Sequence, residues 1–313
     1  MANRKKITVI GAGRVGESTA HILASKALGD VVLVDVVPNV GAGKALDIME
    51  ERPLEGWDVD VVGTDGYAAT AGSDLIILTA GLPRKPGMSR DDLIAANLEI
   101  VKSCSAQAAA ASPDAKLMVV SNPLDVMCFV AKQATGWSKN RVFGMAGVLD
   151  SARFRSFLAM ELNVSVKDVQ AYVLGGHGDE MVPLIRHCSA GGVPITDLLS
   201  ADRIDAIVKR TQGAGGEIVK LLGFSAYYSP AHSAVAMAEA VLKDERRILP
   251  CSAYLEGEYG TSGHYLGVPC LLGANGVERV FELSLTDAER ALLAKSVEAV
   301  KSTTDVAKAK LAG

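Results

Sequence analysis

The sequence predicts an α/β protein, with a doubly wound parallel sheet in the first half and an α+β second half. In the first half, short runs of Val, Ile and Leu alternate with helical patterns, which is typical of βαβ units. After about residue 147, longer helical segments and longer strand-like runs replace this alternation. With 313 residues and 49% hydrophobic content, the chain is long enough for two domains with substantial cores.

The apolar runs of the first half are nearly continuous, as expected for strands buried on both faces of a parallel sheet. The predicted strands are 7–10, 31–34, 59–62, 75–79, 117–121 and 142–143, and helical patterns between them include 15–27 and 91–111. In the second half we predict helices over 151–162, 202–222, 229–243 and 287–310, and strands over 169–174, 247–256 and 267–272. The expected domains are 1–147 and 148–313.

Composition excludes several classes of function. The net charge is −4 and no long run of Lys or Arg occurs, so we expect no nucleic-acid partner and no membrane partner. The N-terminal region lacks the roughly 7–15 apolar residues of a secretory signal, and no stretch reaches the roughly 18 of a membrane span. The five cysteines are scattered without a CxxC pair, which predicts no metal site and favours a cytoplasmic location.

A glycine-rich turn follows the first predicted strand. It reads Gly11-Ala12-Gly13-Arg14-Val15-Gly16 and opens a helix, and the next strand ends at Asp35. Such glycines allow a tight turn and close approach to a pyrophosphate, while a strand-end carboxylate binds the adenosine ribose and repels a 2′-phosphate. This predicts NAD, in preference to NADP. FAD uses the same glycine pattern, but no second flavin motif is evident, and a turn without a ligand is the remaining alternative.

Polar clusters follow several other strands, where an open parallel sheet binds its ligands. These clusters are the loop 82–90 with three cations, Ser121-Asn122-Pro123, Asp150-Ser151-Ala152-Arg153, and Gly175-Gly176-His177-Gly178-Asp179. His177 is suited to proton transfer, Asp150 to orienting an imidazole, and arginines to binding carboxylates. A solvated basic turn, a turn-forming Asn, a helix cap and a structural His are the alternative interpretations.

Together these segments resemble the malate/lactate dehydrogenase superfamily over essentially the whole chain, and most closely its lactate-dehydrogenase-like malate dehydrogenases. The resemblance implies a Rossmann NAD-binding domain and a C-terminal substrate domain. It implies that His177 is the proton donor and acceptor, with Asp150 as its partner. It also implies that Arg153 pairs with the C1 carboxylate of the substrate and that Arg90 polarises the carbonyl. Asn122 would contact both substrate and NAD. The resemblance further implies that the NAD site is lined by Asn97, Val120 and Ser121.

Arg84 distinguishes the subfamilies, because lactate dehydrogenases that resemble this pattern usually have Gln there. A second substrate carboxylate buried without a partner would cost several kcal/mol, and a cation at position 84 offsets that cost. Malate and oxaloacetate are therefore the predicted substrates. The alternatives are lactate or another 2-hydroxy acid, and a non-catalytic NAD-binding protein. The resemblance also implies a homotetramer or homodimer, and His232 stands where relatives often have Ala.

Overall fold

A doubly wound sheet forms the centre of the protein. The computed structural model describes residues 4–83 and 90–312, and within them nine strands form one sheet in the order β14-β13-β12-β6-β5-β4-β1-β2-β3. Six strands are parallel: β1 (Lys6–Ile10), β2 (Asp30–Val34), β3 (Val61–Thr64), β4 (Leu75–Leu78), β5 (Lys116–Val119) and β6 (Val142–Gly144). Their order, 3-2-1-4-5-6, is that of a dinucleotide-binding fold, which confirms the predicted fold class.

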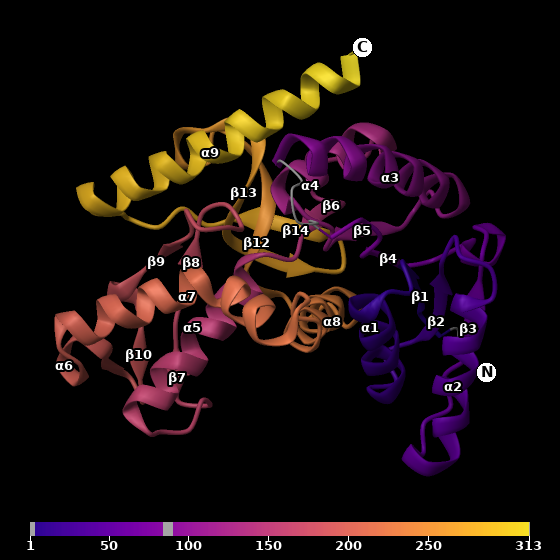
Figure 1. Cartoon of the computed structure of the whole chain (residues 1–313), viewed down its shortest axis with the longest axis horizontal. Coiled ribbons are helices and arrows are strands. Elements are labelled where there is room, and N and C mark those ends of the chain that lie inside the picture. The colour runs from indigo at the N-terminus through magenta and orange to yellow at the C-terminus, as the bar shows by residue number, and fades with distance from the viewer. Residues whose placement is uncertain (1–3, 84–89, 313) are drawn as a thin grey trace.

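Helices cover both faces of this sheet, because successive strand residues point to opposite sides. Ile7 and Val9 of β1 pack with α1 (Arg14–Ser25) and α2 (Val40–Glu55), whereas Ile10 packs with α3 (Arg90–Ala111) and α4 (Leu124–Thr135). In Figure 1, α3, α4 and α9 (Asp287–Ala312) lie on one side and α1, α2 and α8 (Tyr228–Leu242) on the other. The alternation of strands and helices predicts helices at α2 and α4 but not their bounds; two glycines and Pro53 obscure the helical pattern of α2.

The second half continues the same sheet. The strands β12 (Arg247–Glu256), β13 (Ser262–Gly273) and β14 (Gly276–Val280) run antiparallel to one another, and β12 joins β6 through Ser252 opposite Gly144. The backbones approach closely at this point: a Cβ on Gly144 would lie 2.9 Å from the Cβ of Ser252 and 2.5 Å from Cys128 Sγ. The second half therefore shares its sheet with the first and is not simply laid against it.

Helix α5 (Gly147–Leu162) and helix α7 (Ala201–Leu222) flank the smaller strands of the second half. Buried residues of α7 recur at helical spacing, at Ile204, Ile207, Thr211 and Ala214. The other elements are η1 (Ala68–Thr70), β7 (Val169–Gln170), β8 (Val173–Leu174), β9 (Val182–Pro183), η2 (Ile185–His187), β10 (Ser189–Ala190), β11 (Val193–Pro194), α6 (Ile195–Leu198) and η3 (Glu258–Gly260).

The single strand predicted over 169–174 is wrong. Its two ends pair with different partners, because β7 pairs with β10 while β8 pairs with β9 in another sheet. The largest boundary differences are at α5, which begins at Gly147 and not at 151, and at β13, which begins at Ser262 and not at 267. The other predicted boundaries, including the start of β3 at Val61, differ by no more than two residues.

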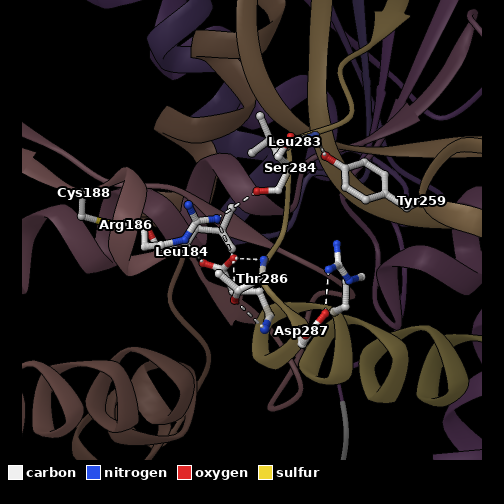
Figure 2. Close-up of polar contacts among 10 residues, drawn as sticks. Leu184, Arg186, Cys188, Tyr259, Leu283, Ser284, Thr286 and Asp287 are labelled. Atoms are coloured by element: carbon white, nitrogen blue, oxygen red, sulfur yellow. Dashed lines mark hydrogen bonds and ion pairs between the residues drawn. The ribbon is translucent and has the colours of Figure 1, made fainter.

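Hydrogen bonds link the start of α9 to η2, which follows the His177 loop in the sequence. Thr286 and Glu289 form a reciprocal capping box, and each backbone N–H donates to the other's side chain. Arg186 of η2 donates to both carboxylate oxygens of Glu289, at 3.1 and 2.7 Å, and to the carbonyl oxygen of Ser284 (Figure 2). Tyr259, between β12 and β13, also contacts the segment that precedes α9: its hydroxyl donates to the carbonyl oxygen of Phe281 and accepts from the backbone N–H of Leu283. Among the described residues, no helix is both long enough and apolar enough to cross a membrane.

Candidate active site

The glycine turn lies at the point where the strand order reverses, between β1 and β4. Gly11 has φ +99, and a Cβ there would lie 2.8 Å from the backbone nitrogen of Ala80. A Cβ on Gly16 would lie 1.7 Å from the carbonyl oxygen of Gly11, so the helix cannot pack here with a larger residue. Gly13, in contrast, has nothing within 4 Å of its Cβ position. The turn therefore leaves open space only at the glycine predicted to approach the pyrophosphate.

Asp35 is held by the turn it is predicted to serve. Its carboxylate accepts hydrogen bonds from the backbone N–H groups of Ala12 at 2.7 Å and Val37 at 2.9 Å. Lys44 Nζ donates to the carbonyl oxygen of Ala12 at 2.6 Å, so both polar groups of this peptide segment are fixed. The strand-end acid thus shapes the turn as well as facing the ligand cavity.

A cavity of about 700 Å³ opens beside the turn. Of the described residues that line it, the charged ones are all acidic: Asp35, Asp65 and Glu99. A ribose can donate hydroxyl hydrogens to such carboxylates, whereas an added 2′-phosphate would meet like charge without a cation. The cavity therefore fits the adenosine portion of NAD better than that of NADP.

Arg14 and Val15 begin α1, but their side chains are directed away from the turn. The guanidinium of Arg14 stacks 3.4 Å above the centre of the Phe224 ring, in the link between α7 and α8, and lies 6.0 Å from the Tyr227 ring. Val15 packs against the core. Their contribution to a phosphate site is therefore that of the helix N-terminus and its backbone N–H groups.

The structure brings His177, Asp150 and Arg153 together. His177 Nδ1 lies 2.8 Å from Asp150 Oδ2, and Arg153 donates to the other carboxylate oxygen at 3.4 Å. Asp150 is only 2% exposed. Burial lowers the pKa of His177, but the charge and hydrogen bond of Asp150 and the charge of Asp125 raise it, and the net pKa is raised. The imidazolium form is thereby stabilised, with Nε2 left as the ring nitrogen that is not paired with Asp150.

Arg153 retains unused hydrogen-bonding capacity. Its Nε is buried and has no partner in the part of the chain that the structure describes. Burial lowers the pKa of its guanidinium, opposed by the Asp150 carboxylate. A buried, partly unsatisfied guanidinium next to His177 is suited to receive a ligand carboxylate.

The predicted asparagines have different surroundings. Asn122 lines a cavity of about 390 Å³ together with His177. Asn97 instead uses its amide within the chain: Oδ1 accepts from the backbone of Leu82 at 2.7 Å, and Nδ2 donates to the carbonyl oxygens of Leu82 and Asn122 at 3.1 and 2.7 Å. Ser121 Oγ donates to the carbonyl oxygen of Ala80 at 2.5 Å, and Val120 is 8% exposed. These contacts hold two strand-end loops beside each other.

The two arginines with predicted substrate contacts in the loop 82–90 are Arg84 and Arg90. Arg84 lies outside the described residues, and Arg90 is the first residue of α3 but its side chain is not described. Their proposed substrate contacts remain predictions.

Two functional candidates escaped the sequence prediction. Asp125 Oδ2 accepts from the backbone N–H of His177 at 2.9 Å, and Ser296 Oγ accepts from that of Gly176 at 2.8 Å. Asp125 carries a signal in the sequence, because it is a lone acid in the buried run Leu124 to Ala131. Ser296 carries none, since it is one polar residue in a largely polar helix.

Two family sequence models match the chain consecutively. The lactate/malate dehydrogenase NAD-binding domain matches residues 5–144, and the lactate/malate dehydrogenase alpha/beta C-terminal domain matches residues 147–311. The chain belongs to the lactate/malate dehydrogenase family. This membership confirms the predicted family and the NAD cofactor.

The relatives of this lactate/malate dehydrogenase family member include both malate dehydrogenases and lactate dehydrogenases. Malate dehydrogenases of Roseiflexus castenholzii and Geobacillus kaustophilus are each 58% identical, over 96% of this chain and 97% of theirs. The malate dehydrogenase structure from Salinibacter ruber is 51% identical with a TM-score of 0.93, covering 97% of each chain. A Cryptosporidium parvum lactate dehydrogenase structure, complexed with lactic acid and cofactor, is 42% identical with a TM-score of 0.95, covering 98% of this chain and 99% of that one. The fold is thus common to both activities.

Proposed function

We propose that the protein is an NAD-dependent malate dehydrogenase that interconverts (S)-malate and oxaloacetate. The observation that carries the proposal is the buried group of His177, Asp150 and Arg153, which joins a proton donor, its orienting acid and a carboxylate-binding cation. The malate dehydrogenase names of its 58%-identical relatives support the choice of substrate.

His177 is the proton donor and acceptor in this proposal. In oxaloacetate reduction, protonated Nε2 donates its proton to the carbonyl oxygen, while Nδ1 keeps its hydrogen bond to Asp150. In malate oxidation, neutral Nε2 accepts the proton of the substrate hydroxyl. When bound, NADH supplies the hydride to the carbonyl carbon and NAD⁺ accepts it in the reverse direction. The raised pKa of His177 favours the acid form needed for reduction.

Three arginines bind and polarise the substrate in this proposal. Arg153 pairs with the C1 carboxylate, for which its unsatisfied Nε is available. Arg90 polarises the carbonyl, and Arg84 pairs with the second carboxylate of the dicarboxylate. Asn122, in the same cavity as His177, orients substrate and cofactor.

The proposal divides the chain into an NAD-binding domain over 1–147 and a catalytic domain over 148–313, which carries His177, Asp150 and Arg153. Arg84, Arg90 and Asn122 reach the substrate from the NAD-binding domain. NAD contacts would come from the turn Gly11–Gly16, from Asp35, and from the strand-end residues Asn97, Val120, Ser121 and Asn122. For Asn97, this contact is indirect, through the loops that its amide holds. The proposal further includes a cytoplasmic homotetramer or homodimer, which light scattering of the purified protein tests.

A direct assay tests the proposal. Purified protein is mixed with NADH and either oxaloacetate or pyruvate, and the loss of NADH absorbance is followed. We expect rapid turnover with oxaloacetate and little with pyruvate, and Arg84→Gln should cost oxaloacetate far more than pyruvate. Brisk turnover of pyruvate alone would replace this proposal with lactate dehydrogenase, an alternative favoured by the similarity to that enzyme's fold. NADH binding without any turnover would indicate a non-catalytic NAD-binding protein.

A further inference from the structure

A second buried carboxylate lies behind His177. Asp125 is the second residue of α4, three residues after Asn122, and is 6% exposed. Its Oδ2 accepts from the His177 backbone at 2.9 Å, and its Oδ1 accepts from Ser252 Oγ of β12 at 2.6 Å. Burial raises the pKa of the Asp125 carboxyl, whereas the hydrogen bonds from Ser252 and the His177 backbone lower it. Both oxygens accept from N–H or O–H donors, which are the partners of an ionised carboxylate. Asp125 therefore links α4, the His177 loop and β12 at one point.

The His177 loop has little freedom to shift. Gly175 exchanges backbone hydrogen bonds with Gly267, at 2.9 and 3.1 Å, and the next N–H is held by Ser296 of α9. A Cβ on Gly176 would lie 2.5 Å from a methyl carbon of Val300 and 3.3 Å from Asp125 Oδ2. The loop thus lies between α4 and α9, and Asp125 of α4 accepts a hydrogen bond from His177 itself.

We propose that Asp125 is a positioning residue of the active site, which holds the His177 backbone in register with Asn122 and supplies a second negative charge to the imidazole. The inference rests on the proposed function, because Asn122 and His177 are the residues placed on the substrate there. It goes beyond that function by giving a role to a residue outside the group that touches substrate.

The charges that face His177 come from three elements. Asp150 and Arg153 belong to α5, Asp125 to α4, and the loop's own Asp179 and Glu180 line the same cavity. Among the described residues, Ser296 of α9, which accepts from the loop, and Ser252 of β12, which donates to Asp125, are uncharged. Burial has the largest effect on the pKa of His177 and lowers it; the Asp150 carboxylate and then the Asp125 carboxylate raise it, and Arg153 lowers it. Since Asp125 is hydrogen-bonded to the His177 backbone N–H, we expect removal of its charge to lower that pKa.

The test is Asp125→Asn, which keeps one oxygen for the His177 N–H while its amide can donate to the Ser252 hydroxyl. The pH dependence of kcat/KM is measured in both directions. We expect the alkaline limb of oxaloacetate reduction and the acid limb of malate oxidation to move together to lower pH. The control is Asp287→Asn, whose side chain is 98% exposed at the start of α9 and should leave both limbs in place. Limbs that stay at their wild-type positions in Asp125→Asn would overturn the proposal.

A second measurement separates this inference from the proposed function. The His177 pKa is measured by NMR of labelled histidine without any substrate, with His177→Asn identifying the signal among the five histidines. A lower His177 pKa in Asp125→Asn supports the inference even if oxaloacetate is not turned over, and an unchanged value contradicts it even if oxaloacetate is turned over.

Loss of the positioning contact has its own signature. Asp125→Ala removes a charge-assisted hydrogen bond, so we expect kcat to fall about 10- to 100-fold while KM for NADH stays near the wild-type value. If the Asp125 variants fail to fold, Ser252→Ala carries the test, because it loosens Asp125 and keeps its charge. Wild-type kcat in Ser252→Ala would then refute the positioning role, and a reduced kcat with unmoved limbs would support it.

Discussion

Replacing Asp150 by Asn should reduce turnover without dismantling the site. The side chain keeps its size, is 2% exposed, and lies 2.8 Å from His177 Nδ1. A separation of about 4 Å between the two charges corresponds to about 4 kcal/mol at an effective dielectric constant of about 20. Since each 1.4 kcal/mol or so is a factor of ten, kcat for oxaloacetate reduction should fall about a thousandfold.

Steady-state kinetics with NADH and oxaloacetate over a range of pH measure this change. Loss of the Asp150 charge lowers the pKa of His177, so the alkaline limb of the reduction profile should move to lower pH. KM for NADH should stay unchanged, because Asp150 does not line the adenosine cavity. A thermal melt shows whether the variant is folded. A folded Asp150→Asn protein with kcat within tenfold or so of wild type and an unmoved limb would refute the role given to Asp150.

Three further changes probe the cofactor turn and the α9 anchor. Asp35→Ser should raise KM for NADH and lower KM for NADPH, as measured with oxaloacetate in excess, because the carboxylate that repels a 2′-phosphate is removed. Gly16→Ala places a Cβ 1.7 Å from the carbonyl oxygen of Gly11, so a lower melting temperature and loss of NADH binding by fluorescence titration are expected. Arg186 lowers the pKa of Glu289 from 4.5 to about 2, so this pair stabilises the fold above about pH 4.5 and the effect is lost as pH falls towards about 2. Glu289→Gln should therefore melt below wild type near neutral pH, and the difference should shrink over that acidic range; a constant difference would contradict the assignment.

The sequence predicts the parallel half of the fold well because its strands are buried on both faces. Continuous apolar runs at 7–10 and 75–79 have few other interpretations, and both became strands within a residue. The run 169–174 has a similar local pattern, but its two ends pair with different strands, β10 and β9, in two separate sheets. Pairing of that kind depends on tertiary structure, which local pattern does not contain.

In the candidate site, too, some residues can be predicted from the sequence and others cannot. His177, Asp150 and Asn122 stand in short motifs after strands, so their types and spacing indicate their chemistry. Asp125 and Ser296 act through contacts with the His177 loop that span 52 and 120 residues. Asn97 was assigned to the NAD site, yet its amide is used by Leu82 and Asn122. A residue's hydrogen-bonding partners, unlike its type, become visible only in three dimensions.

Gly144 and Ser252, the pair of opposed residues that joins β6 to β12, limit which substitutions this protein can accept. Ser252 joins the two halves of the sheet and donates to Asp125, while position 144 has no room for a side chain beside Cys128. A substitution at either position alone changes the spacing of the strands or the contact with Asp125. In a library randomised at positions 128, 144 and 252, active variants should therefore be recovered as compensating combinations, and single changes there should be rare among the survivors.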